Sequence, residues 1–367
     1  MSKPRRRKQK KQVKAELKLR QFAATELSDQ LAALPCAADL PRFMVDTVAG
    51  AYAPADAELM IEGFGAAATR PVTLRANTLK ATAEDIAAAL DAAGIAHRPV
   101  AWYPDASILP EAQVSDLWDL DIYRDGKIYL QSLSSMMPPL VLGAQAGEDI
   151  LDMCAAPGGK TTQIAALTQG QAHLTACEMS IPRAEKLEAN LHRQGAKNVP
   201  VMRIDARELD EFFRFDRILL DAPCTGTGTV VSGNEKSLRG LTEQLLSKCA
   251  RSQRALLDRA MGALKPGGTL VYSTCSILPQ ENEDALQEAL DKHMDCELIP
   301  LDGTPSESEA RRAQEAGEKP RIESNALTEA IAAGQVSAIA NGLPGTLTIP
   351  PSREFEGFYI ALIRKRS

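Results

Sequence analysis

The sequence is poor in aromatic residues, which make up 4% of its 367 positions, and it has only four histidines. It contains no apolar run near the ~20 residues that a membrane-spanning helix needs, so we expect no transmembrane segment. The basic start lacks the apolar core of a secretory signal. The seven cysteines are odd in number and form no Cys-x-x-Cys pair, which argues against a zinc ribbon and against a disulfide framework. We therefore expect no membrane or metal partner. The expected location is the cytoplasm, or the nucleus or nucleolus of a eukaryotic host, and a monomer is the default expectation, since the sequence does not indicate an oligomeric state.

Charge is unevenly distributed along the chain. Residues 1–20 hold ten Lys or Arg and one acid, a charge of +9, whereas the whole chain carries −6, which leaves −15 for residues 21–367. A basic tail on an acidic body suggests contact with the phosphates of a nucleic acid. The alternative is a solvated, disordered tail that only adds solubility.

The first third of the chain predicts two units. Residues 21–70 have Ala and Leu at helical spacing and form a helical lead-in. Residues 71–135 predict a small α/β subdomain. It begins with a strand over 72–77, continues with a helix over 82–93 that Thr82 caps, and includes a strand over 98–102.

Residues 136–367 alternate between strand and helix. The alternation predicts a doubly wound, mostly parallel sheet with a Rossmann-like arrangement. Its seven expected strands are 148–153, 173–179, 199–205, 217–221, 269–274, 296–301 and 358–364. Residues 302–345 are polar and rich in Ala, Glu, Ser and Gly, and we interpret them as an inserted segment with one helix near 327–332.

Chemically distinctive residues follow several of these strands. Residues 150–161, ILDMCAAPGGKT, read as a strand, a glycine turn and a helix start, which suits a ligand with negative charge. The turn lacks the Gly-x-Gly-x-x-Gly pattern of a nicotinamide dinucleotide site. Glu178, Asp205 and Asp221 end the next three strands. Acids at successive strand ends fit an adenosine with a charged tail, so S-adenosylmethionine is the expected cofactor.

Two cysteines need a joint explanation. Cys224 follows one strand in LLDAPCTGTG, and Cys275 ends another in YSTCS. A thiolate that adds to C6 of a cytosine or uracil ring makes C5 nucleophilic enough to accept a methyl group from a sulfonium. The C5 proton must then leave before the thiol departs, and a second thiol can assist.

The motifs DMCAAPGGKT, LLDAPCTGTG and YSTCSILPQENE together resemble those of the RNA cytosine-5 methyltransferases of the Sun/Fmu family. The resemblance covers about residues 70–365 and is closer to the nucleolar-antigen branch than to the small-subunit methyltransferase B branch. It implies a class I methyltransferase domain with an RNA-recognition-like N-terminal subdomain. The implied partner is RNA, with ribosomal RNA favoured and transfer RNA possible.

The resemblance also implies roles for single residues. Cys275 is the nucleophile, Cys224 the second thiol, Asp221 lies between methyl donor and cytosine, and Lys160 touches the base. Glu178 is placed at the ribose, Asp205 at the adenine and Arg183 on the cofactor side. The implied cofactor residues are Cys154, Ala155, Ala156, Pro157, Gly158, Gly159, Lys160, Glu178, Arg183, Asp205 and Asp221.

Three alternatives remain open from the sequence. A DNA cytosine-5 methyltransferase would use Cys224 as its nucleophile. A transfer RNA methyltransferase would share all of the motifs. A ribosome-assembly factor would keep the fold and bind RNA with little catalysis.

Overall fold

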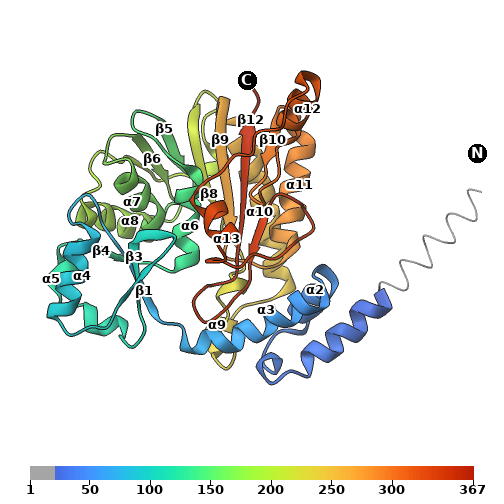
Figure 1. The fold of residues 1–367 in the computed structure, drawn as a ribbon, viewed down its shortest axis with the longest axis horizontal. Coiled ribbons are helices and arrows are strands. Elements are labelled where there is room, and N and C mark those ends of the chain that lie inside the picture. The colour runs from blue at the N-terminus through green and yellow to red at the C-terminus, as the bar shows by residue number, and fades with distance from the viewer. Residues whose placement is uncertain (1–20) are drawn as a thin grey trace, which may run out of the picture.

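The computed structural model describes residues 21–367 and contains two β-sheets (Figure 1). The predicted basic tail, residues 1–20, lies outside the described residues. Within the described part, no helix is both long and apolar enough to span a bilayer.

The larger sheet follows the order β10-β12-β9-β8-β5-β6-β7. These are the seven predicted strands, and an eighth short strand, β11, pairs with β12. Strand β12 is antiparallel to both of its neighbours in this path, whereas β7, β6, β5, β8 and β9 pair in parallel. From β5 the chain adds β6 and β7 on one side of the sheet and then β8 and β9 on the other side, so the strand order switches between β5 and β8. The crevice beyond the carboxyl ends of these two strands is the expected ligand site. The strand bounds are β5 Asp149–Asp152, β6 His173–Cys177, β7 Val201–Met202, β8 Phe215–Asp221, β9 Leu264–Thr274, β10 Cys296–Ile299, β11 Leu347–Ile349 and β12 Phe358–Lys365.

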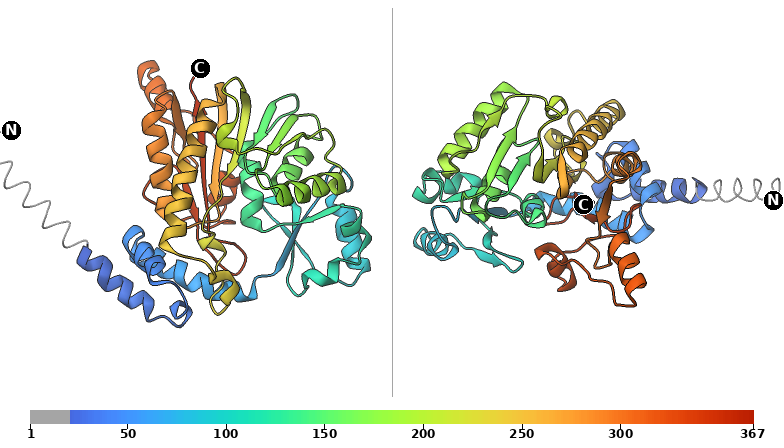
Figure 2. Two further views of the ribbon diagram at one scale, coloured as in Figure 1. Left: turned by 180° about the vertical axis from the view of Figure 1, so that it is seen from behind. Right: turned by 90° about the horizontal axis from the view of Figure 1, so that it is seen from above.

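Helices cover both faces of this sheet (Figure 2). One face packs against α6 (Leu133–Leu142), α7 (Gly159–Leu167) and α8 (Ile181–Gln194), and the other against α10 (Glu243–Gly262) and α11 (Glu283–Lys292). The central strands are buried on both sides, which explains why β8 reads as the continuous apolar run Ile218, Leu219 and Leu220.

The segment 302–345 contains two helices, α12 (Glu307–Ala316) and α13 (Ala326–Ala332). The second lies where the sequence predicts a helix. Its buried residues Leu327 and Ala330 join the hydrophobic core on the α6 side of the sheet. The sequence did not indicate α12, because the residues of this helix are mostly polar and only Ala313 is buried.

The smaller sheet has the order β2-β3-β1-β4 and is entirely antiparallel. Its elements are β1 Val72–Ala76, α4 Ala83–Ala92, β2 Arg98–Val100, β3 Tyr103–Leu109, α5 Asp121–Arg124 and β4 Ile128–Leu130. Thr82 caps α4 as predicted, in a reciprocal capping box with Asp85. The pairing register shifts between Pro99 and Val100, so β2 is shorter than predicted and β3 follows it directly.

The lead-in is helical over residues 21–32, in α2 (Arg42–Ala51) and in α3 (Pro54–Ala66). Its apolar side packs against the part of the chain that forms the large sheet, because Val230, Leu246 and Ile277 belong to the same hydrophobic cluster. The Tyr52 hydroxyl donates to the Ile277 carbonyl at 2.8 Å, two residues beyond Cys275. The lead-in therefore supports the loop that follows β9.

Candidate active site

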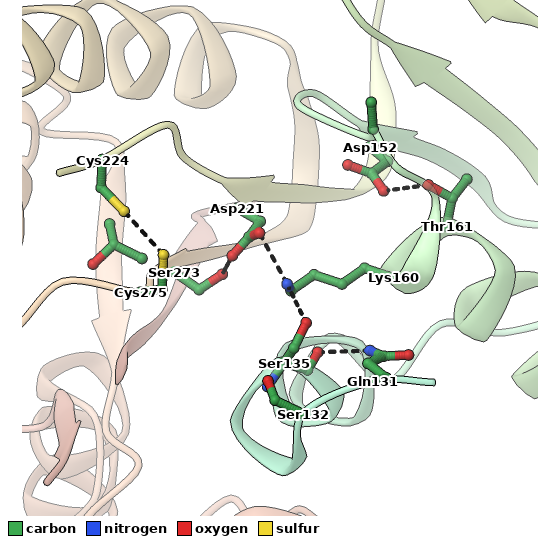
Figure 3. Close-up of polar contacts among 12 residues, drawn as sticks. Gln131, Ser132, Ser135, Asp152, Lys160, Thr161, Asp221, Cys224, Ser273 and Cys275 are labelled. Carbon is green, nitrogen blue, oxygen red and sulfur yellow. Dashed lines mark hydrogen bonds and ion pairs between the residues drawn. The ribbon is translucent and has the colours of Figure 1, made fainter. Parts of the chain in front are cut away.

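Three strand ends meet around one cavity of about 330 Å³ (Figure 3). Strand β5 ends at Asp152, β8 at Asp221, and β9 runs out into Cys275. Parallel strands place their carboxyl ends on one rim, which brings together residues far apart in sequence. The residues that line the cavity are Tyr129, Leu130, Gln131, Ser132, Ser135, Asp152, Cys154, Ala155, Ala156, Pro157, Gly159, Lys160, Asp221, Thr229, Cys275, Glu356 and Phe358.

The two predicted thiols lie side by side, with 3.3 Å between the Sγ atoms of Cys224 and Cys275. The hydrogen bond with Cys275, together with burial, raises the pKa of Cys224 well above its usual value. Because two adjacent thiolates repel each other, the pair loses its first proton more easily than its second. Only Cys275 of the two lines the cavity, so its sulfur is the one that faces this space.

Backbone contacts hold Cys275 in place. Its carbonyl accepts from the Gly228 amide at 2.9 Å, and the Gly228 carbonyl accepts from Gly357 at 2.8 Å. A Cβ atom at Gly228 would lie 1.9 Å from the Gly357 carbonyl oxygen. The approach of these two backbones requires glycine, which explains the Thr-Gly-Thr-Gly sequence after Cys224.

Lys160 and Asp221 form an ion pair inside the cavity, with 2.9 Å between Nζ and Oδ2. Lys160 also donates to Ser135 Oγ at 2.7 Å, and Ser273 Oγ donates to Asp221 Oδ1 at 2.8 Å. Burial disfavours the lysine cation, but the charge and hydrogen bond of Asp221 outweigh burial and raise the pKa of Lys160. The site therefore presents a fixed ammonium beside a fixed carboxylate (Figure 3).

The glycine turn after β5 leads into α7 through Gly158, whose φ of +106° is in the left-handed region. Asp152, at the end of β5, is 1% exposed and accepts a hydrogen bond from Thr161 Oγ1 at 2.7 Å through Oδ2. Its Oδ1 atom has no hydrogen-bond partner within the described residues. Burial raises the pKa of Asp152 to about 6.

A second, smaller cavity of about 60 Å³ adjoins the first at Cys154, which lines both. Glu178 and Asp205, the two residues that the resemblance places at the ribose and the adenine, both line it. Arg183 donates to the Ala156 carbonyl at 2.7 Å and lies 3.4 Å from Glu178 Oε2. Arg207 pairs with Asp205 and lowers the pKa of this carboxyl group.

These residues fit S-adenosylmethionine. The buried Asp152 Oδ1 atom lacks a partner and suits a cationic ligand group, and the two joined cavities offer separate places for an adenosine and for a methyl acceptor. Cys154, Ala155, Ala156, Pro157 and Gly159 line the larger cavity, Cys154 also lines the smaller one, and Gly158 supplies the turn.

Sequence reasoning missed several cavity residues. Ser135 holds Lys160, and Glu356 Oε2 accepts from Ser132 Oγ at 2.6 Å. The ring of Phe358 lies 5.6 Å from Lys160 Nζ. These residues come from the segments 126–136 and 355–365, and the three motifs alone do not show that these segments meet at the strand ends.

No cluster of three or more His, Cys, Asp or Glu side chains in residues 21–367 is arranged to hold a metal ion.

Two family models match the chain. The model for 16S rRNA methyltransferase RsmB/F matches residues 139–364, and the RsmF/B-like ferredoxin-like domain matches residues 40–115. Among curated proteins, the chain is 40% identical over 219 residues to ribosomal RNA small subunit methyltransferase F of Shewanella loihica, covering 58% of this chain and 45% of that protein. It is 34% identical over 318 residues to the protein of the same name from Vibrio parahaemolyticus, covering 84% of this chain and 60% of that protein.

Solved structures are similar over almost the whole chain. A methyltransferase homolog protein from Pyrococcus horikoshii is 30% identical with a TM-score of 0.69, covering 93% of this chain and 99% of that one. NSun6 from Pyrococcus horikoshii, solved with SFG, has a TM-score of 0.69 at 23% identity, covers 89% of this chain and 99% of that one, and supports the fold alone.

The chain spans about half the length of the curated relatives it matches. The larger family model nevertheless covers most of it, from α6 to β12, and the smaller one covers part of the lead-in and the small sheet. Methyltransferases of this fold take their methyl group from S-adenosylmethionine, so the match confirms the predicted cofactor. The chain belongs to the 16S rRNA methyltransferase RsmB/F family.

Proposed function

We propose that this protein transfers a methyl group from S-adenosylmethionine to C5 of a cytosine in ribosomal RNA. The observation that carries the proposal is the Cys224–Cys275 pair, 3.3 Å apart, beside the Lys160–Asp221 ion pair. Relatives that are named ribosomal RNA small subunit methyltransferase F support ribosomal RNA over transfer RNA.

In the first step, the Cys275 thiolate forms an Sγ–C6 bond to the cytosine. Negative charge then accumulates on the ring, and the Lys160 ammonium is positioned to stabilise it. Asp221 keeps Lys160 charged and oriented. The cytosine must leave its base stack to expose C6, so the target is a flipped or single-stranded nucleotide.

S-adenosylmethionine, when bound, would supply an electrophilic methyl group on a sulfonium for transfer to C5. The glycine turn and Cys154 to Lys160 would hold its methionine part, with Asp152 facing the cationic end. Glu178 would bind the ribose and Asp205 the adenine, while Arg183 fixes Ala156 and Glu178 relative to each other.

Release needs two coupled bond changes. The C5 proton leaves, its electron pair rebuilds the C5–C6 double bond, and the C6–S bond breaks with return of the thiolate to Cys275. Once Cys275 is bonded to C6 it is an uncharged thioether, so its hydrogen bond with Cys224, the largest influence that raises the pKa of Cys224, is weakened and its charge no longer acts. Cys224 would then assist removal of the proton, directly or through water.

We further propose that the small subdomain, residues 71–135, contributes to RNA binding, as its position beside the cavity allows. Gln131 and Ser132 follow directly after its last strand and line the cavity. The protein would act as a monomer in the cytoplasm, where ribosomal RNA is made in a bacterial host.

Three proteins test the proposal: wild type, Cys224→Ala and Cys275→Ala. Each is incubated with ribosomal RNA and S-adenosylmethionine labelled in the methyl group, then separated on a denaturing gel. We expect a persistent covalent RNA–protein band from Cys224→Ala, because attack proceeds and release does not. Cys275→Ala should give neither a band nor labelled 5-methylcytosine.

Other outcomes separate the alternatives. A band from Cys275→Ala instead of Cys224→Ala would reverse the thiol roles and favour the arrangement of DNA cytosine-5 methyltransferases. A wild-type protein that binds RNA without labelling it would favour an assembly factor. Labelled transfer RNA with unlabelled ribosomal RNA would change the substrate but keep the chemistry.

A further inference from the structure

We infer that Glu281 is a positioning residue for Cys224, a role that extends the proposed release step. Glu281 lies in the 3-10 turn Pro279–Glu281 after β9, and its side chain does not line the reaction cavity. It is fully buried, with 0% exposure. Burying a carboxylate costs folding free energy unless hydrogen bonds compensate for the lost contact with water. The groups that make these hydrogen bonds therefore indicate what Glu281 holds in place.

Those partners flank Cys224. Glu281 Oε1 accepts from the Thr225 amide at 2.7 Å, and Oε2 accepts from the Thr225 hydroxyl. Gln253 Nε2 donates to the Pro223 carbonyl at 2.9 Å and to Glu281 Oε1 at 3.3 Å. The residues before and after Cys224 are thus both hydrogen-bonded to the buried pair Glu281 and Gln253. We call this pair, with its contacts to Pro223 and Thr225, the Glu281 clamp.

The clamp is itself anchored on two rigid elements. Gln253 is fully buried in α10, and the Tyr272 hydroxyl, from β9, donates to the Glu281 carbonyl. Strand β9 also delivers Cys275. Glu281 therefore joins the two elements: its carboxylate contacts the turn that carries Cys224, and its backbone carbonyl contacts the strand that carries Cys275. Together these contacts set the separation of the two sulfurs.

This geometry predicts a selective defect. Loss of the clamp lets the Cys224 turn move, while Cys275 keeps its own contacts with Gly228. Attack on C6 should continue and release should slow, because displacement of a reacting group by about 1 Å costs up to ~100-fold in rate. A residue that only stabilised the fold would reduce both steps together.

The first test compares Glu281→Leu, Glu281→Gln and Glu283→Leu in the full-length protein. Glu283 is a matched control because it is 4% exposed, two residues away, and neither carboxylate oxygen has a hydrogen-bond partner among the described residues. With ribosomal RNA, Glu281→Leu should raise the ratio of trapped adduct to released product by at least about tenfold. Glu281→Gln should restore turnover, because its amide oxygen accepts from Thr225 and Gln253 while the Thr225 hydroxyl turns to accept from the amide nitrogen.

The second test does not depend on methylation. Diamide removes one hydrogen from each of two neighbouring thiols and is reduced to the hydrazine, which leaves a disulfide. Its rate of joining Cys224 to Cys275, followed by peptide mass mapping, reports the distance between the sulfurs. The rate should fall in Glu281→Leu and, to a lesser extent, in Thr225→Val, which loses one of the two Thr225 contacts without changing the size of the side chain.

The outcomes are distinguishable. If Glu281→Leu and Thr225→Val both form the disulfide at the wild-type rate, the inference that the clamp positions Cys224 is wrong, regardless of any change in RNA methylation. Slower disulfide formation together with an inactive wild type supports the clamp and overturns the proposed function. If Glu281→Leu does not fold, Thr225→Val decides alone, and an unchanged adduct ratio and disulfide rate in this variant overturn the inference.

Discussion

Cys224 Sγ lies 3.3 Å from Cys275 Sγ, although 51 residues separate them in the sequence. They meet because β8 and β9 are parallel neighbours. Asp221 is paired with Ser273, so the two strands end side by side at the same edge of the sheet. Each cysteine is partly accessible. The two thiols are therefore close enough for an oxidant to join them in a disulfide.

The first prediction is reversible inactivation by thiol oxidants. Diamide should join Cys224 to Cys275, abolish methyl transfer, and leave an intact mass lower by two hydrogens; dithiothreitol should restore both. Cys224→Ala cannot form this bond and should keep its ability to trap RNA after the same treatment. Cys154→Ser is the control for the third nearby thiol, and its oxidation should resemble that of wild type. Mass mapping that finds both Cys224 and Cys275 free in the inactivated protein would contradict the prediction.

The second prediction concerns Asp152. Burial raises its pKa to about 6, above the ~3.9 expected in an unfolded chain, so the folded protein favours the protonated form. The contribution of this group to folding stability is therefore greatest below about pH 4 and is lost as pH rises through about 6. Binding of a ligand whose ammonium group contacts Asp152 has the opposite dependence, since this contact needs the carboxylate. Affinity for S-adenosylhomocysteine should fall as pH drops below about 6.

Asp152→Asn tests both effects. At pH 8 it should weaken S-adenosylhomocysteine binding by roughly tenfold to a hundredfold, because a hydrogen bond to a charged group contributes about 1.5–3 kcal/mol. It should also remove the pH step near 6 in calorimetric titrations. Asp149→Asn is the matched control, since Asp149 begins the same strand but pairs with Lys265 outside the cavity. An Asp152→Asn variant that retains the same pH step would show that another group titrates there.

The positions of the strand ends at this site can be predicted from the sequence, because each strand end follows a short apolar run. Ile218, Leu219 and Leu220 are buried on both faces of the sheet, so the pattern in the sequence directly reflects their environment. Asp221 and Cys224 come next, and chain order alone places them at the rim. The same reasoning predicts all seven strands in the path of the large sheet.

The side chains that hold these strand-end residues in place cannot be predicted in this way. Glu281 has the sequence appearance of an acid at a helix start, and only the packing of α10 against β9 shows that it holds Thr225 and, through Gln253, Pro223. Glu356 meets Ser132 across 224 positions in the sequence. Such contacts depend on how separate elements pack, which periodicity and spacing do not encode.

Arg75 provides the last prediction, which concerns how the small sheet is joined to the glycine turn after β5. We call this turn the cofactor turn, because we propose that it holds S-adenosylmethionine. Arg75 lies in β1, is 0% exposed, and donates to the Gly159 carbonyl at 3.0 Å, to Thr162 Oγ1 at 2.7 Å and to Gln131 Oε1 at 2.9 Å. Burial lowers the pKa of Arg75 to about 10, so the guanidinium remains charged at neutral pH. Its three contacts tie the small sheet to the first turn of α7 and to a residue that lines the reaction cavity.

Arg75→Met keeps most of the apolar volume but leaves the Gly159 carbonyl and Gln131 without this donor. We expect urea unfolding to show a loss of about 1–3 kcal/mol, and S-adenosylhomocysteine binding to weaken because Gly159 belongs to the cofactor turn. Arg75→Lys should recover little of either, since an ammonium cannot reproduce the planar fork of donors. Arg98→Met is the control: Arg98 pairs with Glu354 at a half-exposed position, and its loss should cost less than about 1 kcal/mol. If Arg75→Met were as stable as Arg98→Met and bound the ligand normally, the small sheet would be held to the cofactor turn by apolar packing rather than by this buried cation.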